Sequence, residues 1–175
     1  METKNSWVLD PTHSEVQFKV KHLMMTNVTG AFKVLHAGIA ADENFAEAKV
    51  SFTADINSVD TGNAQRDGHL KGGDFFDAEK FPELSFVSKH YNAAENKISG
   101  DLTVKGVTKP VTLDVEYNGA HKDPWGNLKA GFSVSGKINR KDWGLSWNAA
   151  LEGGGLLVSE DVKINAELQF VKQTA

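Results

Sequence analysis

Six histidines are the residues of this chain that could hold a metal ion: His13, His22, His36, His69, His90 and His121. Their spacing matches no compact ligand pattern, such as two histidines four residues apart on a helix with a glutamate between them. Four of them could still converge inside a closed barrel. His22 falls among apolar residues, where a polar group needs a hydrogen-bond partner. We therefore expect no metal site, a His22 that bonds a carbonyl or a serine, and a His13 that caps a strand.

Hydrolase chemistry would need serine, histidine and carboxylate side chains in a defined arrangement. Ser14 follows His13, and Asp67 lies two residues before His69. Neither pair stands in the G-x-S-x-G pattern of a nucleophile elbow. The chain contains no cysteine, so disulfides, thiolate metal sites and thiol nucleophiles are excluded. We predict a protein that is not an enzyme and requires no cofactor.

The chain has the size and charge of one soluble domain, spanning residues 1–175. Its 19 basic and 23 acidic residues form no basic stripe, so we expect no nucleic acid partner. No run approaches the roughly 20 apolar residues that span a bilayer, so we expect no stable membrane insertion. The opening "METKNSWVLD" lacks the apolar stretch of a secretory signal, which predicts a cytoplasmic location. A mature exported chain given a new initiator methionine would look the same and would be periplasmic.

Alternation of apolar and polar residues, the pattern of a strand with one buried face, dominates the sequence. Residues 14–24, "SEVQFKVKHLM", place Val16, Phe18, Val20 and His22 on one face. The same period recurs at about 30–34, 50–56, 84–88, 98–104, 111–117, 128–138 and 162–170. Short turns between these segments favour antiparallel neighbours. The fold class is therefore all-β, with about eight antiparallel strands that can close into a β-barrel or form a sandwich.

The apolar faces of these strands supply the candidate lining of an internal cavity. The candidates are Val16, Phe18, Val20, His22, Phe32, Phe52, Phe86, Leu102, Leu113, Phe132, Val134 and Ile164. A barrel of about eight strands either fills with side chains or holds one small ligand. The same faces carry small residues, among them Gly30, Gly100 and Gly136. These either leave room for a ligand or fit a sharply bent sheet.

Two long connections interrupt the strands, at 60–82 and at 139–161. The first contains most of "QRDGHLKGGDFFDAEKFPELSF" and predicts a short helix at about 63–71, followed by closely spaced phenylalanines. The aromatic residues either tie the connection to the sheet or, with basic neighbours, form a cavity mouth for an amphiphile with a polar or anionic head. The candidate mouth residues are Arg66, His69, Lys71, Phe75 and Phe76.

Three tryptophans and one candidate ion pair lie in the connections between the alternating segments. Trp125, Trp143 and Trp147 are expected at a barrel rim or in a dimer contact, and the sequence does not choose between them. Arg140 and Asp142, in "NRKDWG", are expected to form a turn-stabilising ion pair, worth at most about 1 kcal/mol if exposed.

Four motifs, in order and with matching spacing, resemble the YceI-like polyisoprenoid-binding proteins over essentially the whole chain. They are "WVLDPTHSEVQFKVKH", "QRDGHLKGGDFFDAEKFPELSF", "GDLTVKGVTKPVTL" and "GKINRKDWGL". The resemblance implies a lipocalin-like, extended barrel of eight strands whose elongated apolar cavity accommodates an isoprenoid chain. It also implies that the 60–82 connection is the helix-bearing one, and our own hypothesis is that this connection gates the cavity. Some members of the family are dimers, so a homodimer is one expectation for this chain.

From this resemblance we predict that the barrel binds a long-chain polyisoprenoid or isoprenoid-quinone-type lipid, for carriage, storage or sequestration. Each buried CH₂ group is worth roughly 0.8 kcal/mol, so the affinity should grow with chain length. The next-best role for His22 is contact with the polar head of that lipid. Two alternatives stay open: an enzyme that acts on such lipids, and a stress-related structural module without a ligand.

Overall fold

The structure, a computed structural model, consists mainly of β-strands, and it describes residues 5–23, 25–41, 45, 48–145 and 158–173. The strands are β1 (Asn5–Leu9), β2 (Glu15–His22), β3 (Thr26–Phe32), β4 (Leu35–Ala41), β5 (Lys49–Asp55), β6 (Val59–Asp60), β7 (Glu83–Asn92), β8 (Lys97–Val104), β9 (Val107–Lys122), β10 (Leu128–Asn139) and β11 (Asp161–Lys172). The helical segments are α1 (Ala64–Lys71) and the short 3-10 helices η1 (Pro11–His13), η2 (Ile56–Ser58) and η3 (Arg140–Trp143).

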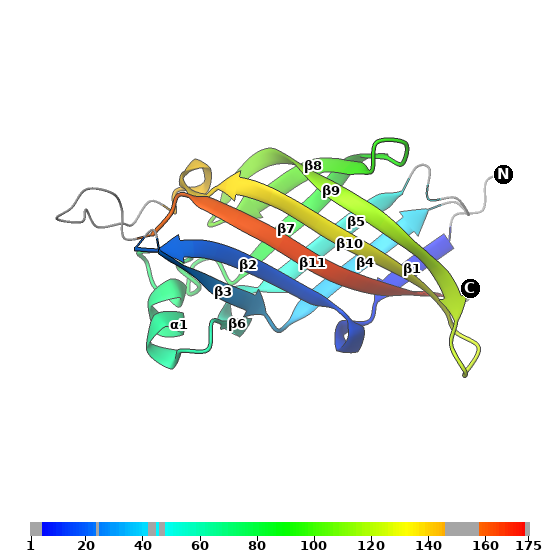
Figure 1. The fold of residues 1–175 in the computed structure, drawn as a ribbon, viewed down its shortest axis with the longest axis horizontal. Coiled ribbons are helices and arrows are strands. Elements are labelled where there is room, and N and C mark those ends of the chain that lie inside the picture. Colours follow the sequence, from blue (N-terminus) through cyan, green and yellow to red (C-terminus); the bar gives the residue numbers. More distant parts are fainter. Residues whose placement is uncertain (1–4, 24, 42–44, 46–47, 146–157, 174–175) are drawn as a thin grey trace.

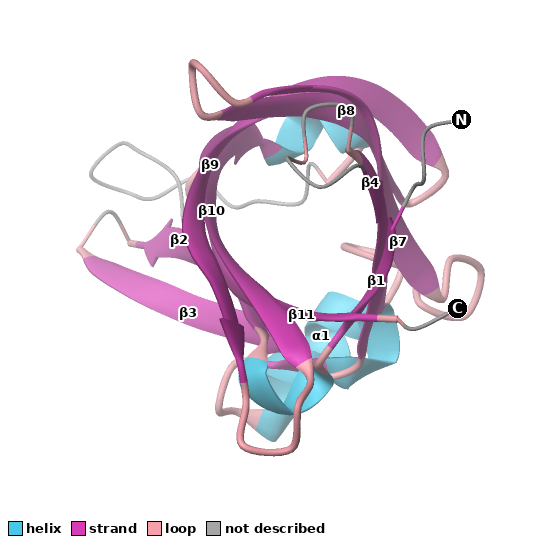
Figure 2. Cartoon of the chain, turned by 90° about the vertical axis from the view of Figure 1, so that its right-hand side faces the viewer, coloured by secondary structure: helices cyan, strands magenta, loops and turns pink. Residues whose placement is uncertain are grey.

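Eight of these strands form a closed antiparallel ring, in the order β1-β4-β5-β7-β8-β9-β10-β11. The pairing of β1 with β11, which sets Leu9 opposite Phe170, closes the ring, and Figure 2 views it from one end. β2, β3 and β6 continue β1, β4 and β5, and β2 pairs with the other half of β11. The predicted all-β, eight-stranded, lipocalin-like barrel is confirmed. The residues that alternate inward on each strand form its core.

The barrel is elongated, and its two ends differ. Figure 1 shows α1 at one end, beside the tips of β2 and β3. The described chain termini and the hairpin between β9 and β10 lie at the other end. We call these the α1 end and the terminal end.

A capped turn explains why the first barrel strand breaks between β1 and β2. The Asp10 carboxylate accepts hydrogen bonds from the Thr12 backbone N–H at 3.0 Å and from the Thr12 hydroxyl at 2.6 Å. Pro11 has no N–H to give to a strand ladder, which favours a break at this point. The Ser14 hydroxyl donates to the Asp10 carbonyl at 2.7 Å and accepts from the Gln169 N–H at 3.0 Å. The break is therefore fastened to β11.

The helix predicted at 63–71 is confirmed as α1. The Asn63 side chain caps its first turn by accepting from the Arg66 N–H at 3.0 Å, and the helix ends at Gly72. The eight residues of α1 include none that is fully buried, so the helix flanks the barrel and does not fill it. Across the described residues, no helix is long and apolar enough to cross a membrane.

Two strands of the ring, β1 and β4, are absent from the strand segments that the sequence predicts. β4 reads "LHAGIAA", in which Ala37 and Gly38 occupy opposite faces and both are small. Such a segment shows little contrast between its faces, so its period of two is faint. β1 has only five residues, too few for a period to stand out.

Candidate functional site

The barrel encloses a cavity of about 420 Å³ that is lined mainly by apolar side chains. Alternate residues of β11 contact it, from Val162 near the α1 end to Phe170 near the terminal end. At about 3.4 Å per residue, this stretch of strand spans roughly 27 Å. The cavity is therefore long and narrow, and it follows the barrel axis.

All twelve residues predicted as cavity lining contact this cavity. They are Val16, Phe18, Val20, His22, Phe32, Phe52, Phe86, Leu102, Leu113, Phe132, Val134 and Ile164. Period two assigned them correctly because successive side chains of a strand point to opposite faces of the sheet. That these residues bind a ligand stays a prediction.

The inner glycines give space to neighbouring side chains. The ring of Phe18 fills the position that a Cβ atom on Gly30 would need, and Leu113 does the same at Gly136. At Gly100, a Cβ would lie 2.8 Å from the ring of Phe86. Gly30 and Gly136 therefore each seat a cavity-lining side chain of an adjacent strand. Gly100 also lies against the backbone of Val87 and Ser88, next to the irregular pairing in β7, which agrees with the predicted fit to a bent sheet.

Polar side chains gather where the cavity meets the α1 end. Arg66 and His69 of α1 line the cavity there, as does Thr61. The guanidinium of Arg66 is held by two 2.7 Å hydrogen bonds to Thr61, one to its hydroxyl and one to its carbonyl. His69 Nε2 lies 2.9 Å from the Asp74 carboxylate. Lys71 is not among the cavity-lining residues, so the structure brings together four of the five candidate mouth residues.

The other two mouth candidates, Phe75 and Phe76, both line the cavity and pack against neighbours. Phe76 meets the ring of Phe32 edge-on, with 5.9 Å between centroids, and Phe75 meets His69 at 5.1 Å. The two interpretations of the aromatic group are therefore compatible. The rings tie the connection to the barrel wall and form part of the cavity surface.

Arg140 is a site residue that sequence analysis assigned to another role. It is only 4% exposed, lines the cavity, and donates to the carbonyls of Ser159 at 2.9 Å and Val158 at 3.3 Å. Burial lowers its pKa from the ordinary value, while the nearby Glu160 acts in the opposite direction. Arg140 is therefore not the exposed turn residue that the sequence suggested, and its pairing with Asp142 stays a prediction. The motif around Arg140 shows no alternation of apolar and polar residues, so nothing in the sequence indicated that this side chain is buried.

An aromatic layer fills the barrel at the terminal end. Phe45, Phe132 and Phe170 line the cavity there, with Phe45 and Phe132 at 5.5 Å and Phe132 and Phe170 at 5.9 Å between ring centroids. Trp7 contacts Phe45 at 5.2 Å and is buried, yet it does not line the cavity. The cavity therefore stops at this layer. Phe45 was not predicted, because it is an isolated aromatic residue in a polar loop.

The histidines do not converge on a metal site. Among the described residues, no three His, Cys, Asp or Glu side chains are placed to hold a metal ion. His13 Nδ1 lies 2.9 Å from the Asp10 carboxylate in the turn before β2, where the capping side chain is that of Asp10 and not, as predicted, that of His13. The ring of His22 lines the cavity, and within the described part of the chain it makes no hydrogen bond to a carbonyl or a serine, contrary to the prediction.

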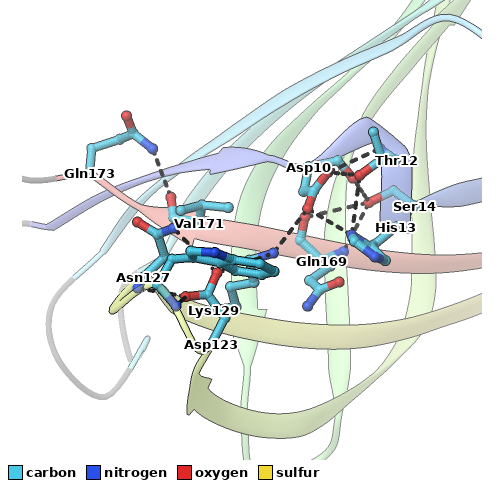
Figure 3. Close-up of polar contacts among 11 residues, drawn as sticks. Asp10, Thr12, His13, Ser14, Asp123, Asn127, Lys129, Gln169, Val171 and Gln173 are labelled. Atoms are coloured by element: carbon cyan, nitrogen blue, oxygen red, sulfur yellow. Dashed lines mark hydrogen bonds and ion pairs between the residues drawn. The ribbon is translucent and has the colours of Figure 1, made fainter.

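An ion-pair network on the outer wall fastens the terminal end of the barrel (Figure 3). Lys129 Nζ lies 3.3 Å from Asp10 Oδ2 and 3.7 Å from Asp123 Oδ2. The Asp123 carboxylate also accepts from the Asn127 N–H at 2.9 Å and so closes the hairpin between β9 and β10. Hydrogen bonds from Thr12 and His13 are the main causes that hold the pKa of Asp10 well below its usual range.

The tryptophans divide between the core and the surface. Trp143 is 3% exposed and its Nε1–H donates to the Leu102 carbonyl at 2.9 Å, so neither predicted role fits it. Trp125, at the tip of the β9–β10 hairpin, is 82% exposed. Trp147 lies outside the described residues.

A closed antiparallel barrel around an elongated apolar cavity defines a lipocalin-like class of β-barrel protein. The family model of the YceI-like domain matches residues 7–170, and the chain belongs to this family. A UPF0312 protein of Staphylococcus aureus strain MW2 is 41% identical over 167 residues, covering 94% of this chain and 96% of the relative.

Solved structures show the same fold. A YCEI protein of Campylobacter jejuni is 38% identical with a TM-score of 0.76, over 88% of this chain and 90% of that one. A polyisoprenoid binding domain of Saccharophagus degradans is 19% identical with a TM-score of 0.67, over 95% and 98%. The second likeness shows the fold alone.

Proposed function

We propose that this protein binds a long-chain polyisoprenoid or an isoprenoid-quinone-type lipid inside its barrel and serves to carry, store or sequester it. The observation that carries the proposal is the shape and lining of the cavity, which is long, narrow and apolar. Burying an apolar chain there removes it from water at roughly 0.8 kcal/mol per CH₂ group. Membership of the YceI-like family and the fold shared with a polyisoprenoid binding domain support it.

The two ends of the cavity suggest an orientation for the lipid. The polar side chains of Arg66, His69 and Arg140 line the cavity at the α1 end, whereas phenylalanine rings line the terminal end. A polar or anionic head would lie beside these polar side chains, and the apolar tail would point toward the aromatic layer. Because most of the lining is apolar, the tail contributes most of the binding free energy and the head adds limited selectivity.

Other parts of the function stay predictions. A binding protein of this kind needs no catalytic residues and no cofactor beyond the lipid itself. We also propose a cytoplasmic location, a homodimer and a stress-related role. The gating role of the 60–82 connection is likewise a proposal, supported by the position of α1 beside the polar end of the cavity.

Native mass spectrometry of the freshly purified protein, followed by organic extraction and lipid identification, tests the proposal. We expect a stoichiometric isoprenoid. Phe18→Glu places a charge on the cavity wall and should abolish the bound lipid, while Val87→Glu, at an outward position that is 55% exposed, should retain it. Circular dichroism checks that both variants are folded. A protein that is empty when purified, and stays empty when offered polyprenyl lipids, would overturn the proposal.

A further inference from the structure

The far end of the cavity is closed by a residue that does not belong to a barrel strand. Phe45 lies in the connection between β4 and β5, and its backbone has a φ of +56°, a conformation that residues other than glycine rarely adopt. Its side chain is only 5% exposed. The ring is therefore buried, although the surrounding sequence, "DENFAEA", is mostly polar.

The contacts of Phe45 show that it stands across the cavity and not along its wall. Its ring contacts Trp7 from β1 at 5.2 Å, Tyr117 from β9 at 5.4 Å and Phe132 from β10 at 5.5 Å. β1 and β9 are not neighbours in the ring, so a side chain that touches both spans the lumen. On one side Phe45 faces the cavity, and on the other it covers Trp7, which the cavity does not reach.

We propose that Phe45 is a stopper that determines how long an isoprenoid tail the cavity accepts. This inference rests on the proposed function, because it requires that the tail points away from the α1 end. Each isoprene unit added to a ligand makes binding more favourable as long as the unit is buried against the apolar wall of the cavity. When the tail reaches Phe45, a further unit gains nothing, because it has to fold back or push the head out of the α1 end. The affinity should therefore rise with chain length and then level off. We call the chain length at which the affinity stops rising the levelling point.

A single substitution at Phe45 distinguishes a residue that limits the length of the tail from one that only lines the cavity wall. The phenyl group of phenylalanine has one carbon more than an isoprene unit, so Phe45→Ala should move the levelling point by about one unit toward longer chains. Phe76→Ala is the matched control, since it removes the same atoms from the cavity surface near the α1 end. It should weaken binding of every chain length by a similar factor and leave the levelling point where it is.

The experiment titrates delipidated protein with a series of linear prenyl alcohols of increasing length and records the Kd for each. A levelling point that shifts in Phe45→Ala and not in Phe76→Ala supports the stopper. An unshifted levelling point in Phe45→Ala, or equal shifts in both variants, overturns it while leaving the lipid-binding proposal intact. No binding of any prenyl alcohol by the wild-type protein overturns both. If Phe45→Ala does not fold, Phe45→Leu tests the same direction with a smaller shift, and an unshifted point in that folded variant counts against the stopper.

Discussion

The ring of Phe18, on β2, occupies the space that a Cβ atom on Gly30, on β3, would fill. The two residues are direct cross-strand partners. Phe18 also contacts Phe32 with 5.5 Å between ring centroids. The missing side chain of Gly30 therefore lets a large cavity-lining ring lie flat against the barrel wall.

Gly30→Ala should displace the Phe18 ring into the cavity. We expect a loss of about 1–3 kcal/mol in the free energy of unfolding, the usual range for overpacking a closely packed site. The capacity for the proposed lipid should fall as well, because the displaced ring takes up cavity volume. Chemical denaturation and lipid extraction measure the two effects.

Gly30→Ala combined with Phe18→Leu is the control for this interpretation. The smaller leucine leaves room for the added methyl group, so the double variant should recover part of the stability that Gly30→Ala loses. If the double variant loses as much free energy of unfolding as the two single variants lose together, the added methyl group does not act through the Phe18 ring.

Asp10 should make the fold sensitive to acid. Its folded-state pKa lies below the ordinary value, so the ionised carboxylate stabilises the fold. This contribution is complete above about pH 4, where Asp10 would be ionised in the unfolded chain as well. It is lost as the pH falls below that value toward the folded-state pKa.

Asp10→Asn should therefore cost about 1–3 kcal/mol at neutral pH, and the difference from the wild type should shrink as the pH falls below about 4. Unfolding by urea at a series of pH values measures this. Asp114→Asn, which removes an exposed ion pair with Lys97, serves as a control and should lower the free energy of unfolding by less than Asp10→Asn does, because solvent screens the pair. A difference between Asp10→Asn and the wild type that does not change with pH would contradict the assignment.

Trp143 and Trp125 should differ in their effect on stability. Trp143→Phe leaves the Leu102 carbonyl without its 2.9 Å partner in a buried position, so we expect a loss of about 1–3 kcal/mol. Trp125→Phe changes an exposed ring and should stay within about 0.5 kcal/mol of the wild type. Thermal and urea unfolding distinguish the two, and equal losses would show that the buried hydrogen bond is not the cause.

His22→Ala should weaken binding of the proposed lipid while the barrel remains folded. The ring lines the cavity at the α1 end of β2, where the polar head would lie. We expect a several-fold rise in Kd for a prenyl ligand with a polar head and little change for a hydrocarbon of the same length. An equal rise for both ligands would show that His22 contributes only apolar contact.

Much of the cavity wall could be predicted from period two alone. Val16, Phe18 and Ile164 point inward because a strand in a closed sheet alternates its side chains between lumen and solvent, whatever its neighbours are. The capped start of α1 at Asn63 is equally local, since the side chain that caps and the N–H that it accepts from lie three residues apart. For these features, the residues and their spacing were sufficient.

The sequence by itself thus determined the strand faces, the fold class and the position of the helix. Only the tertiary structure decided that Phe45 closes the cavity, that Arg140 is buried, and that Gly30 seats Phe18. The physical reason is that these three depend on contacts between segments far apart in the chain or in different strands. A lone aromatic residue in a polar loop, a basic residue in a turn and a glycine in a strand each suit several environments. Closure of the barrel selects among them.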